Sequence, residues 1–226
     1  DEVRKRIAII PQEFKLYPNL TPYEFLEYML ILSGRDLDDK RILAQLEQVN
    51  LLAHARQRIG SFSGGMKQRV AIAQALIHDP LVIFADEPTA GLDPEERMRF
   101  RNIFSEIGLE KTVLLSTHIT EDISAATNMV YVLNRGNIIF GGSTKSLIDT
   151  AKGKVWTAIV KNDEEWRAFR SGNLVYSFTL NAATDEVTAV YSPLDSLPRP
   201  GSALVEPILE HAYMLLIHSD APEGLK

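Results

Sequence analysis

Three stretches decide how this chain folds: FSGGMKQR at residues 62–69, LVIFADEP at residues 81–88 and STH at residues 116–118. The first sets a serine and two glycines before a helical pattern. The other two each close a hydrophobic run, which is typical of strands in a parallel sheet covered on both faces. Polar residues at the ends of such strands indicate a ligand site, because parallel sheets bind ligands at their carboxyl ends.

The flanking sequence predicts an α/β fold with a helical insertion. Before residue 62, the pattern predicts a strand at residues 7–10, a helix opened by the capping box Thr21-Pro22-Tyr23-Glu24 and a second helix from Asp38 or Asp39. From residue 64 on, the predicted elements are a helix at 64–77, strands at 81–85 and 112–116, helices from Asp93 and near 121–126, and strands at 129–133 and 138–140. Alternating strands and helices favour a doubly wound parallel sheet.

Residues 152–226 form a separate pattern that predicts a small α+β unit without a catalytic motif. Hydrophobic residues alternate with more polar ones over residues 174–180, which predicts a strand, and the run 187–191 predicts a partner strand. Residues 207–217 predict a closing helix. We therefore expect a core domain at 1–151, with a helical subdomain at about 18–78, and an accessory domain at 152–226.

Composition narrows the classes of function. Hydrophobic residues make up 45% of the 226 residues, which is enough for a buried core, and no run reaches the ~18 apolar residues of a membrane-spanning helix. The net charge of −6 argues against an extended nucleic-acid surface, and the absence of cysteine excludes disulfides and thiolate metal sites. We expect any membrane role to require a partner.

Ser63, Gly64 and Gly65 form a candidate phosphate-binding turn. The first N–H groups of a helix and its dipole attract anions, and glycines let the backbone approach a phosphate closely. Serine is also a common helix cap, so this triplet alone leaves an ordinary capping role open. The acid-ended strand that follows makes the phosphate role the favoured one.

Asp86 and Glu87 are candidates for metal binding and catalysis. Asp86 could hold Mg²⁺ through water, and Glu87 could orient and polarise an attacking water in phosphoryl transfer. Gln12, in the loop after the first strand, could contact both Mg²⁺ and that water. His118 could donate a hydrogen bond to a terminal phosphate. Asp93 is expected to cap the helix at Pro94, with Glu96 completing the capping box, and could also reach a subunit interface.

Taken in order, Gln12, FSGGMKQR, LVIFADEP, AGLD at 90–93 and STH resemble the ATP-binding subunit of an ABC transporter over roughly residues 4–145. The sequence around these motifs is most similar to that of bacterial exporter ATPases. It differs from the usual family pattern at Phe62, where leucine is common, and at Met66, where glutamine is common. The resemblance implies a P-loop NTPase (RecA-like) core, ATP and Mg²⁺ as cofactors, a separate membrane permease contacted near residues 14–28, and a cytoplasmic location at the inner face of the plasma membrane.

The resemblance also assigns the site residues to two subunits. It implies a head-to-tail dimer, favoured as a homodimer, that sandwiches two ATP molecules. In that arrangement Glu87, His118, Gln12 and Asp86 serve the subunit's own nucleotide. The resemblance also assigns nucleotide binding to Ser63, Gly64, Gly65, Gln68 and Asp93. Within this set, the turn Ser63-Gly64-Gly65 binds the nucleotide held by the other subunit.

One expected motif is absent. No G-x-x-x-x-G-K-[ST] phosphate loop occurs, and Gly153-Lys154 is followed by valine. We expect that loop, with an adjoining β-subdomain, to lie upstream of Asp1 in a longer protein, and this chain alone to be inactive as an ATPase.

Two other functions remain open. One is a soluble ABC ATPase acting on nucleic acid or ribosomes, although the negative charge and the absence of a long coiled-coil insertion argue against it. The other is a non-catalytic regulator without a phosphate loop, which the presence of Glu87 and His118 disfavours.

Overall fold

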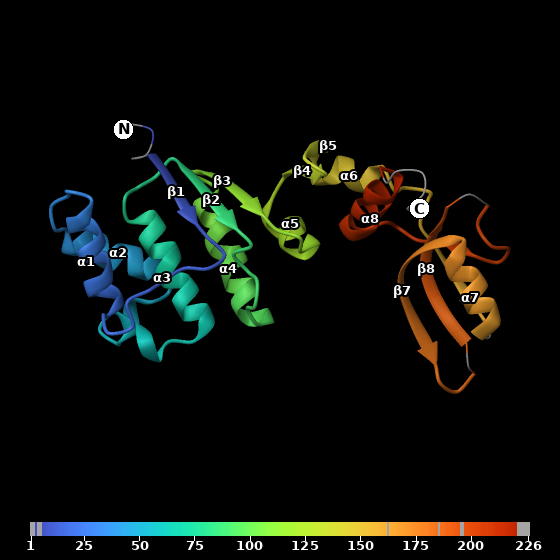
Figure 1. The fold of residues 1–226 in the computed structure, drawn as a ribbon, viewed down its shortest axis with the longest axis horizontal. Helices are drawn as coiled ribbons and strands as arrows, with labels where there is room; N and C mark the ends of the chain where they lie inside the picture. Colours follow the sequence, from blue (N-terminus) through green and yellow to red (C-terminus); the bar gives the residue numbers. More distant parts are fainter. Residues whose placement is uncertain (1–2, 4–5, 162, 185, 195–196, 221–226) are drawn as a thin grey trace. The chain divides into compact units, whose positions relative to one another are not determined.

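A three-stranded parallel sheet organises the first half of the computed structural model, which describes residues 3, 6–161, 163–184, 186–194 and 197–220. The strands are β1 (Ile7–Ile10), β2 (Val82–Asp86) and β3 (Thr112–Ser116), in that spatial order (Figure 1). Ile10 pairs with Ala85, and Asp86 pairs with Ser116. The predicted parallel α/β sheet is confirmed, and the carboxyl ends of all three strands meet at one edge.

The two faces of this sheet differ in burial. Ile83 and Ala85 lie in a buried cluster with residues of α3 (Gly64–Leu76) and α4 (Pro94–Ile107). The register row Ile9, Phe84 and Leu114 lies on the opposite face, where these side chains are 67%, 40% and 52% exposed. The expectation that both faces are covered is therefore wrong for the described residues.

The helical insertion forms as its capping residues predict. Helix α1 (Pro22–Leu32) begins at Thr21, whose hydroxyl accepts a hydrogen bond from the Glu24 N–H while the Glu24 carboxylate accepts one from the Thr21 N–H at 2.8 Å. Helix α2 (Asp39–Gln48) is capped by Asp38. Two short 3₁₀ turns, η2 (Leu52–His54) and η3 (Ile59–Ser61), lead into α3. Helix α5 (Thr120–Ala126) follows β3.

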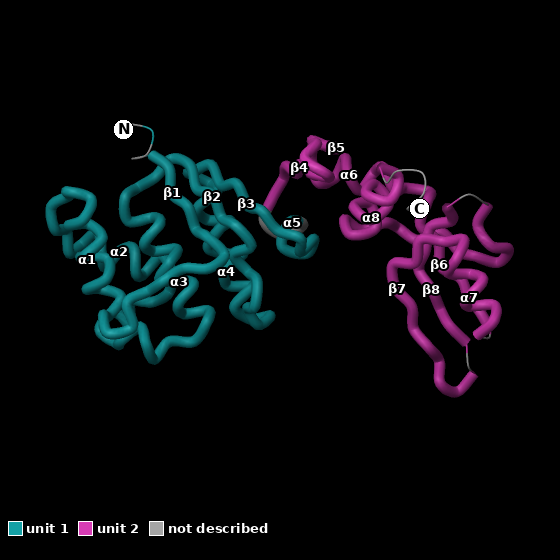
Figure 2. The backbone as a smooth tube through the Cα atoms, in the orientation of Figure 1, with its two compact units in different colours: residues 1–126 teal, residues 127–226 magenta. Residues whose placement is uncertain are grey.

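The chain divides into two compact units between Ala126 and Thr127, earlier than the predicted boundary after residue 151 (Figure 2). The predicted strands at 129–133 and 138–140 do form, as β4 (Met129–Asn134) and β5 (Asn137–Ser143). They make an antiparallel sheet of their own and do not extend the parallel sheet.

The turn between β4 and β5 explains that pairing. Arg135 and Gly136 both have positive φ, at 49° and 79°, which is the backbone of a two-residue hairpin turn. Such a turn reverses the chain at once, so the two strands must pair with each other. Helix α6 (Thr144–Asp149) then packs against α8 (Leu209–Ser219), which connects the hairpin to the rest of the second unit.

The rest of the second unit contains a four-stranded antiparallel sheet made of β6 (Trp156–Val160), β7 (Asn173–Asn181), β8 (Glu186–Pro193) and β9 (Ala203–Leu204), in the order β7-β8-β6-β9. Its core includes Tyr191, Ala189 and Phe169, which are buried. The strands predicted over 174–180 and 187–191 and the helix predicted over 207–217 are confirmed. Helix α7 (Asp163–Ser171) connects β6 to β7.

Candidate functional site at the carboxyl edge of the parallel sheet

The sheet brings several predicted site residues to one edge. Asp86 is the last residue of β2 and pairs in register with Ser116, the last residue of β3. Gln12 follows β1 by two residues and is exposed. Because the strands are parallel, Gln12, the two acids that end β2 and the histidine after β3 share this edge.

Glu87 and His118 are in direct contact. The Glu87 Oε1 atom accepts a hydrogen bond from the His118 backbone N–H at 3.1 Å and lies 2.7 Å from His118 Nδ1. Thr117 adds a longer hydroxyl contact to Oε2 at 3.4 Å. The Glu87 side chain is 20% exposed and that of His118 is 75% exposed, so the carboxylate is held while the imidazole faces solvent.

This contact constrains the chemistry of His118. An ionised carboxylate only accepts hydrogen bonds, so a proton on Nδ1 satisfies the contact with Glu87. A neutral imidazole with its proton on Nδ1 presents Nε2 as an acceptor. Donation to a phosphate oxygen therefore requires a proton on Nε2, either in the imidazolium or after the contact with Glu87 rearranges.

The backbone of Glu87 is strained. Its φ is 43°, in the left-handed region that a glutamate rarely adopts, and Pro88 follows it. The Glu87 N–H donates to the Ser116 carbonyl at 2.9 Å, which fixes the turn against the neighbouring strand. Strain of this kind costs about 1–3 kcal/mol and concentrates at functional sites.

Asp86 fits a role in Mg²⁺ binding. Its Oδ1 accepts a hydrogen bond from the Ser116 hydroxyl, while Oδ2 has no hydrogen-bond partner in the described part of the chain. Among the described residues there is no group of three or more His, Cys, Asp or Glu that could hold a metal alone. Mg²⁺ commonly binds through one or two side-chain oxygens, waters and the phosphates of a substrate. Asp86, which ends β2, and the Gln12 amide, which follows the neighbouring strand β1, suit an ion that arrives with a nucleotide.

The Ser63 turn has two glycines in different surroundings. Ser63 caps α3, and its hydroxyl accepts a hydrogen bond from the Met66 N–H at 3.2 Å, so the capping role is confirmed. A side chain at Gly64 would meet nothing within 4 Å, whereas a Cβ at Gly65 would lie 2.5 Å from the Glu96 side chain. Gly64 thus leaves the helix start open to a ligand, and Gly65 allows α3 to pack closely on α4.

Two further candidates, Gln68 and Asp93, belong to α3 and to the start of α4. Gln68 is only 7% exposed, so its side chain is not presented to solvent beside Ser63 and Gly64. Asp93 caps α4, with Oδ1 accepting from the Glu96 N–H at 2.9 Å. The predicted return bond from the Glu96 carboxylate does not form, because that carboxylate pairs with Arg69 at 3.3 Å and with Arg99 at 3.2 Å.

Arg69 is the last residue of FSGGMKQR, and its structural role was not predicted from the sequence. Its side chain is 8% exposed and joins α3 to two other segments, the Asn50 carbonyl at 3.0 Å and the Glu96 carboxylate. The signal in the sequence was one arginine next to the buried residues Val70, Ala71 and Ile72. Arg69 therefore links the turn at Ser63 to the helix that Asp93 begins.

No helix in the described ranges has both the length and the apolar character needed to cross a bilayer.

Comparison with known proteins agrees with these elements. A family model described as "ABC transporter" matches residues 1–90. The ABC transporter ATP-binding protein NatA of Bacillus subtilis (strain 168) is 37% identical over 159 residues, which is 68% of this chain and 64% of that protein. The cell division ATP-binding protein FtsE of Streptococcus pneumoniae (strain ATCC BAA-255 / R6) is 31% identical over 61% of each chain. The Nod factor export ATP-binding protein I of Burkholderia pseudomallei (strain 1710b) is 35% identical over 66% of this chain and 50% of its own. The chain thus spans between half and two thirds of these relatives.

Proposed function

Because this chain belongs to the family of ABC transporter ATP-binding proteins, we propose that it is the ATP-hydrolysing subunit of an exporter whose membrane permease is a separate chain. The observation that carries the proposal is the contact between Glu87 and His118 beside Asp86. Export as the direction of transport is supported by the relative named for Nod factor export.

In the proposed reaction Glu87 positions a water molecule and takes up its proton as the water attacks the terminal phosphate of ATP. His118 holds the Glu87 carboxylate in place through Nδ1 and its backbone N–H. Asp86 and Gln12 would hold Mg²⁺, which supplies charge neutralisation for the phosphates. The strained backbone at Glu87 aims its carboxylate toward the strand-end residues of β3.

We place the second half of the site on a partner copy of the chain. Ser63 and Gly64 are exposed at the start of α3, where the helix dipole and N–H groups attract a phosphate. In a head-to-tail homodimer this turn would contact the nucleotide that the partner holds. Gln68, being buried, would support the turn from inside, and Asp93 would lie at the dimer interface.

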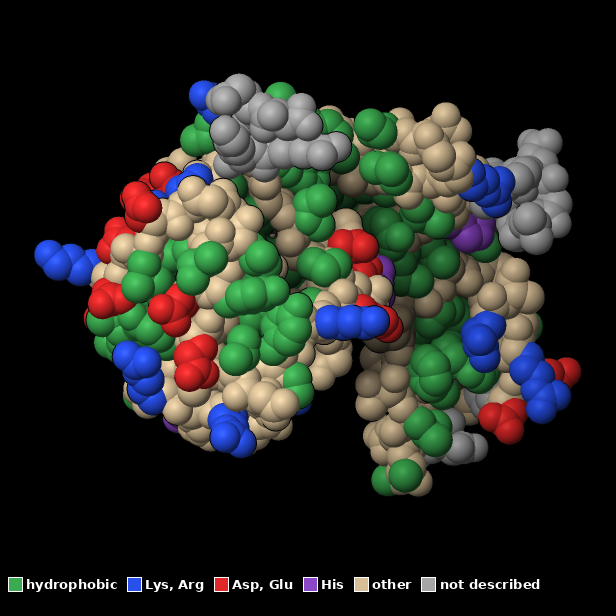
Figure 3. All heavy atoms as spheres, turned by 60° about the vertical axis from the view of Figure 1, so that its left-hand side comes forward, with side chains coloured by type: hydrophobic (Ala, Val, Ile, Leu, Met, Phe, Trp, Pro, Cys, Tyr) green, Lys and Arg blue, Asp and Glu red, His purple; other side chains and the backbone are tan. Residues whose placement is uncertain are grey.

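The surface of the helical insertion supports docking to a permease. Tyr17, Tyr28 and Ile31 are exposed hydrophobic residues at and near α1. Figure 3 shows hydrophobic side chains gathered among charged ones on the side of the first unit that α1 and α2 occupy. We propose that residues 14–28 contact the permease at the inner face of the plasma membrane, and that nucleic acid is not a partner.

These 226 residues contain no G-x-x-x-x-G-K-[ST] loop, the element that cradles the phosphates in P-loop enzymes. Each charge-assisted hydrogen bond contributes about 1.5–3 kcal/mol, so the loss of several lowers affinity by orders of magnitude. We propose that this chain alone binds Mg-ATP more weakly than micromolar and does not hydrolyse it. Calorimetry with Mg-ATP tests this, and micromolar binding would refute it.

The hydrolytic role of Glu87 is tested in a protein extended upstream of Asp1 to include a phosphate loop. We expect Glu87→Gln to lower ATP turnover by about 10²–10⁴-fold while Mg-ATP binding is kept, because the base is lost and the phosphate contacts are not. Glu95→Gln is the matched control, since Glu95 is an exposed acid on α4. Equal turnover in the two variants would exclude Glu87 as the base.

A further inference from the structure

A pocket rich in arginine lies at the edge of the parallel sheet opposite to Glu87. Arg6 and Leu81 immediately precede β1 and β2, and the Leu81 N–H donates to the Arg6 carbonyl at 2.8 Å. Because the strands are parallel, this amino-terminal edge is separated from the catalytic edge by the length of the strands. The pocket has a volume of about 420 Å³ and is lined by Arg6, Arg35, Arg41, His78, Asp79 and Leu81.

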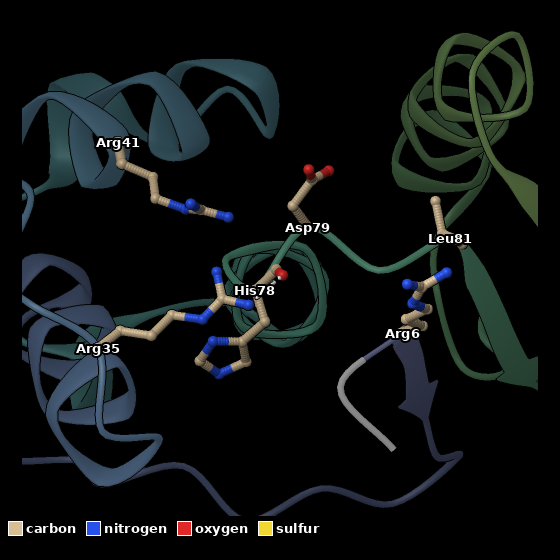
Figure 4. A pocket seen from close by; sticks show the side chains of 6 residues that line it. All are labelled: Arg6, Arg35, Arg41, His78, Asp79 and Leu81. Carbon is tan, nitrogen blue, oxygen red and sulfur yellow. Dashed lines mark hydrogen bonds between the residues drawn. The ribbon is translucent and has the colours of Figure 1, made fainter. Parts of the chain in front are cut away.

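Three separate segments bring the arginines together. Figure 4 shows Arg35 and Arg41 reaching in from the helical side and Arg6 beside Leu81 from the strand side. Arg35 donates from Nη2 to the His78 carbonyl at 3.0 Å, and Arg41 donates from Nε to the Ile77 carbonyl at 2.6 Å. These bonds cap the end of α3 and use one donor each of the five that a guanidinium carries.

The three arginines that line the pocket outnumber its one carboxylate, Asp79. None of the three arginines forms an ion pair within the described part of the chain, and the Asp79 carboxylate is engaged by Lys111 Nζ at 2.5 Å. His78 has a buried Nδ1 atom without a hydrogen-bond partner. Burial is the main cause of the lowered pKa of His78, and the charges of Arg35 and Arg41 lower it further.

Capping of α3 explains two of the arginines but not the third. The Arg6 side chain makes no hydrogen bond or ion pair with any described residue. A guanidinium presents a fork of donors that matches two oxygens of a phosphate, and the volume falls in the range of small-ligand sites. We propose that this pocket binds a phosphate group, from a lipid headgroup or from a free phosphate compound, through Arg6, Arg35 and Arg41.

The test uses the full chain and two phosphate probes. Pyrophosphate in solution is titrated by calorimetry and by NMR of the histidine ring signals. Flotation then compares vesicles of phosphatidylcholine alone with vesicles that also contain phosphatidic acid. Binding of pyrophosphate identifies a free phosphate as the source, and binding only to the phosphatidic acid vesicles identifies a lipid. In either case, we expect the pKa of His78 to rise when the anion binds, because the anion offsets the charges of Arg35 and Arg41.

The variants separate this pocket from unspecific attraction. Arg6→Gln should weaken binding by about tenfold or more without unfolding the chain, since its side chain holds no other residue. Arg6→Lys should recover part of the affinity, because it restores the charge but not the fork. Arg167→Gln removes an exposed charge in the second unit and should change nothing. Absence of binding by both probes, or equal weakening by Arg6→Gln and Arg167→Gln, would overturn the proposal.

Discussion

The buried contact of Arg69 offers the sharpest test of how the Ser63 turn is held in place. Arg69 Nη1 donates to the Asn50 carbonyl at 3.0 Å and reaches the Val49 carbonyl at 3.5 Å, while Nη2 pairs with Glu96 at 3.3 Å. Arg69→Met keeps the long aliphatic stem but removes every donor. The two carbonyls then lose a partner, and Glu96 loses its buried cation.

The structure sets the size of the effect. Breaking a buried ion pair costs about 3–5 kcal/mol when the remaining charge is stranded. Glu96 is not stranded, because Arg99 still contacts it at 3.2 Å, which lowers that cost. Burial lowers the pKa of Arg69, although the charge of Glu96 acts to raise it. Part of the attraction between Arg69 and Glu96 therefore only offsets the cost of removing the guanidinium from water. With the charged hydrogen bond to Asn50 contributing about 1.5–3 kcal/mol, we expect Arg69→Met to destabilise the first unit by about 2–4 kcal/mol.

Hydrogen exchange of α3 amides under increasing urea measures this loss in the first unit. Both tryptophans, Trp156 and Trp166, lie in the second unit, so their fluorescence should unfold at an unchanged midpoint and serves as an internal control. Arg99→Met is the matched variant, since Arg99 is 43% exposed and its ion pairs should contribute less than about 1 kcal/mol. The reasoning fails if Arg69→Met costs no more than Arg99→Met.

Three further predictions concern packing, pH and the open sheet face. Gly65→Ala should destabilise α3 by about 1–3 kcal/mol in circular dichroism melts, because its Cβ would overlap a glutamate of α4, whereas Gly64→Ala meets open space and should have little effect. Burial lowers the pKa of His211, whose Nδ1 accepts from the Ile208 N–H at 3.3 Å. The stabilising contribution of neutral His211 is therefore complete above about pH 6.5, the pKa in the unfolded chain, and is lost as the pH falls toward the lower pKa in the folded chain. Urea midpoints monitored by tryptophan fluorescence should be lower at pH 5.5 than at pH 7.5. This difference between the two midpoints should be smaller in His211→Gln. Phe84→Thr should reduce binding of an apolar dye and self-association in light scattering, because Phe84 lies in the exposed row of the parallel sheet; unchanged values would show that this face is already covered.

Local signals in the sequence were sufficient for much of the fold and of the site. The capping box at Thr21 and the cap at Asp93 are formed by neighbours three residues apart, so they could be predicted without tertiary information. The shared edge of Asp86 and His118 followed from strand direction alone.

Other features depend on contacts that no local pattern encodes. The strands predicted at 129–133 and 138–140 form, but their separation from the parallel sheet, as a hairpin in the second unit, was not predicted. The burial of Gln68 and the role of Arg69 depend on how α3 meets α4, which lies far along the chain. The Glu96 carboxylate does not complete the predicted capping box, because Arg69 of α3 pairs with it and Arg99, three residues along α4, also contacts it.

We propose that each catalytic site joins Glu87 of one subunit to the Ser63 turn of its partner. The most direct test mixes two variants that both contain a phosphate loop and are each inactive alone. One variant carries Ser63→Arg, and the other carries Glu87→Gln. Half of the dimers in an equal mixture are mixed, and each contains one intact site, so ATP turnover should recover to about a quarter of the unmutated level. Turnover as low as that of either parent would contradict the shared site.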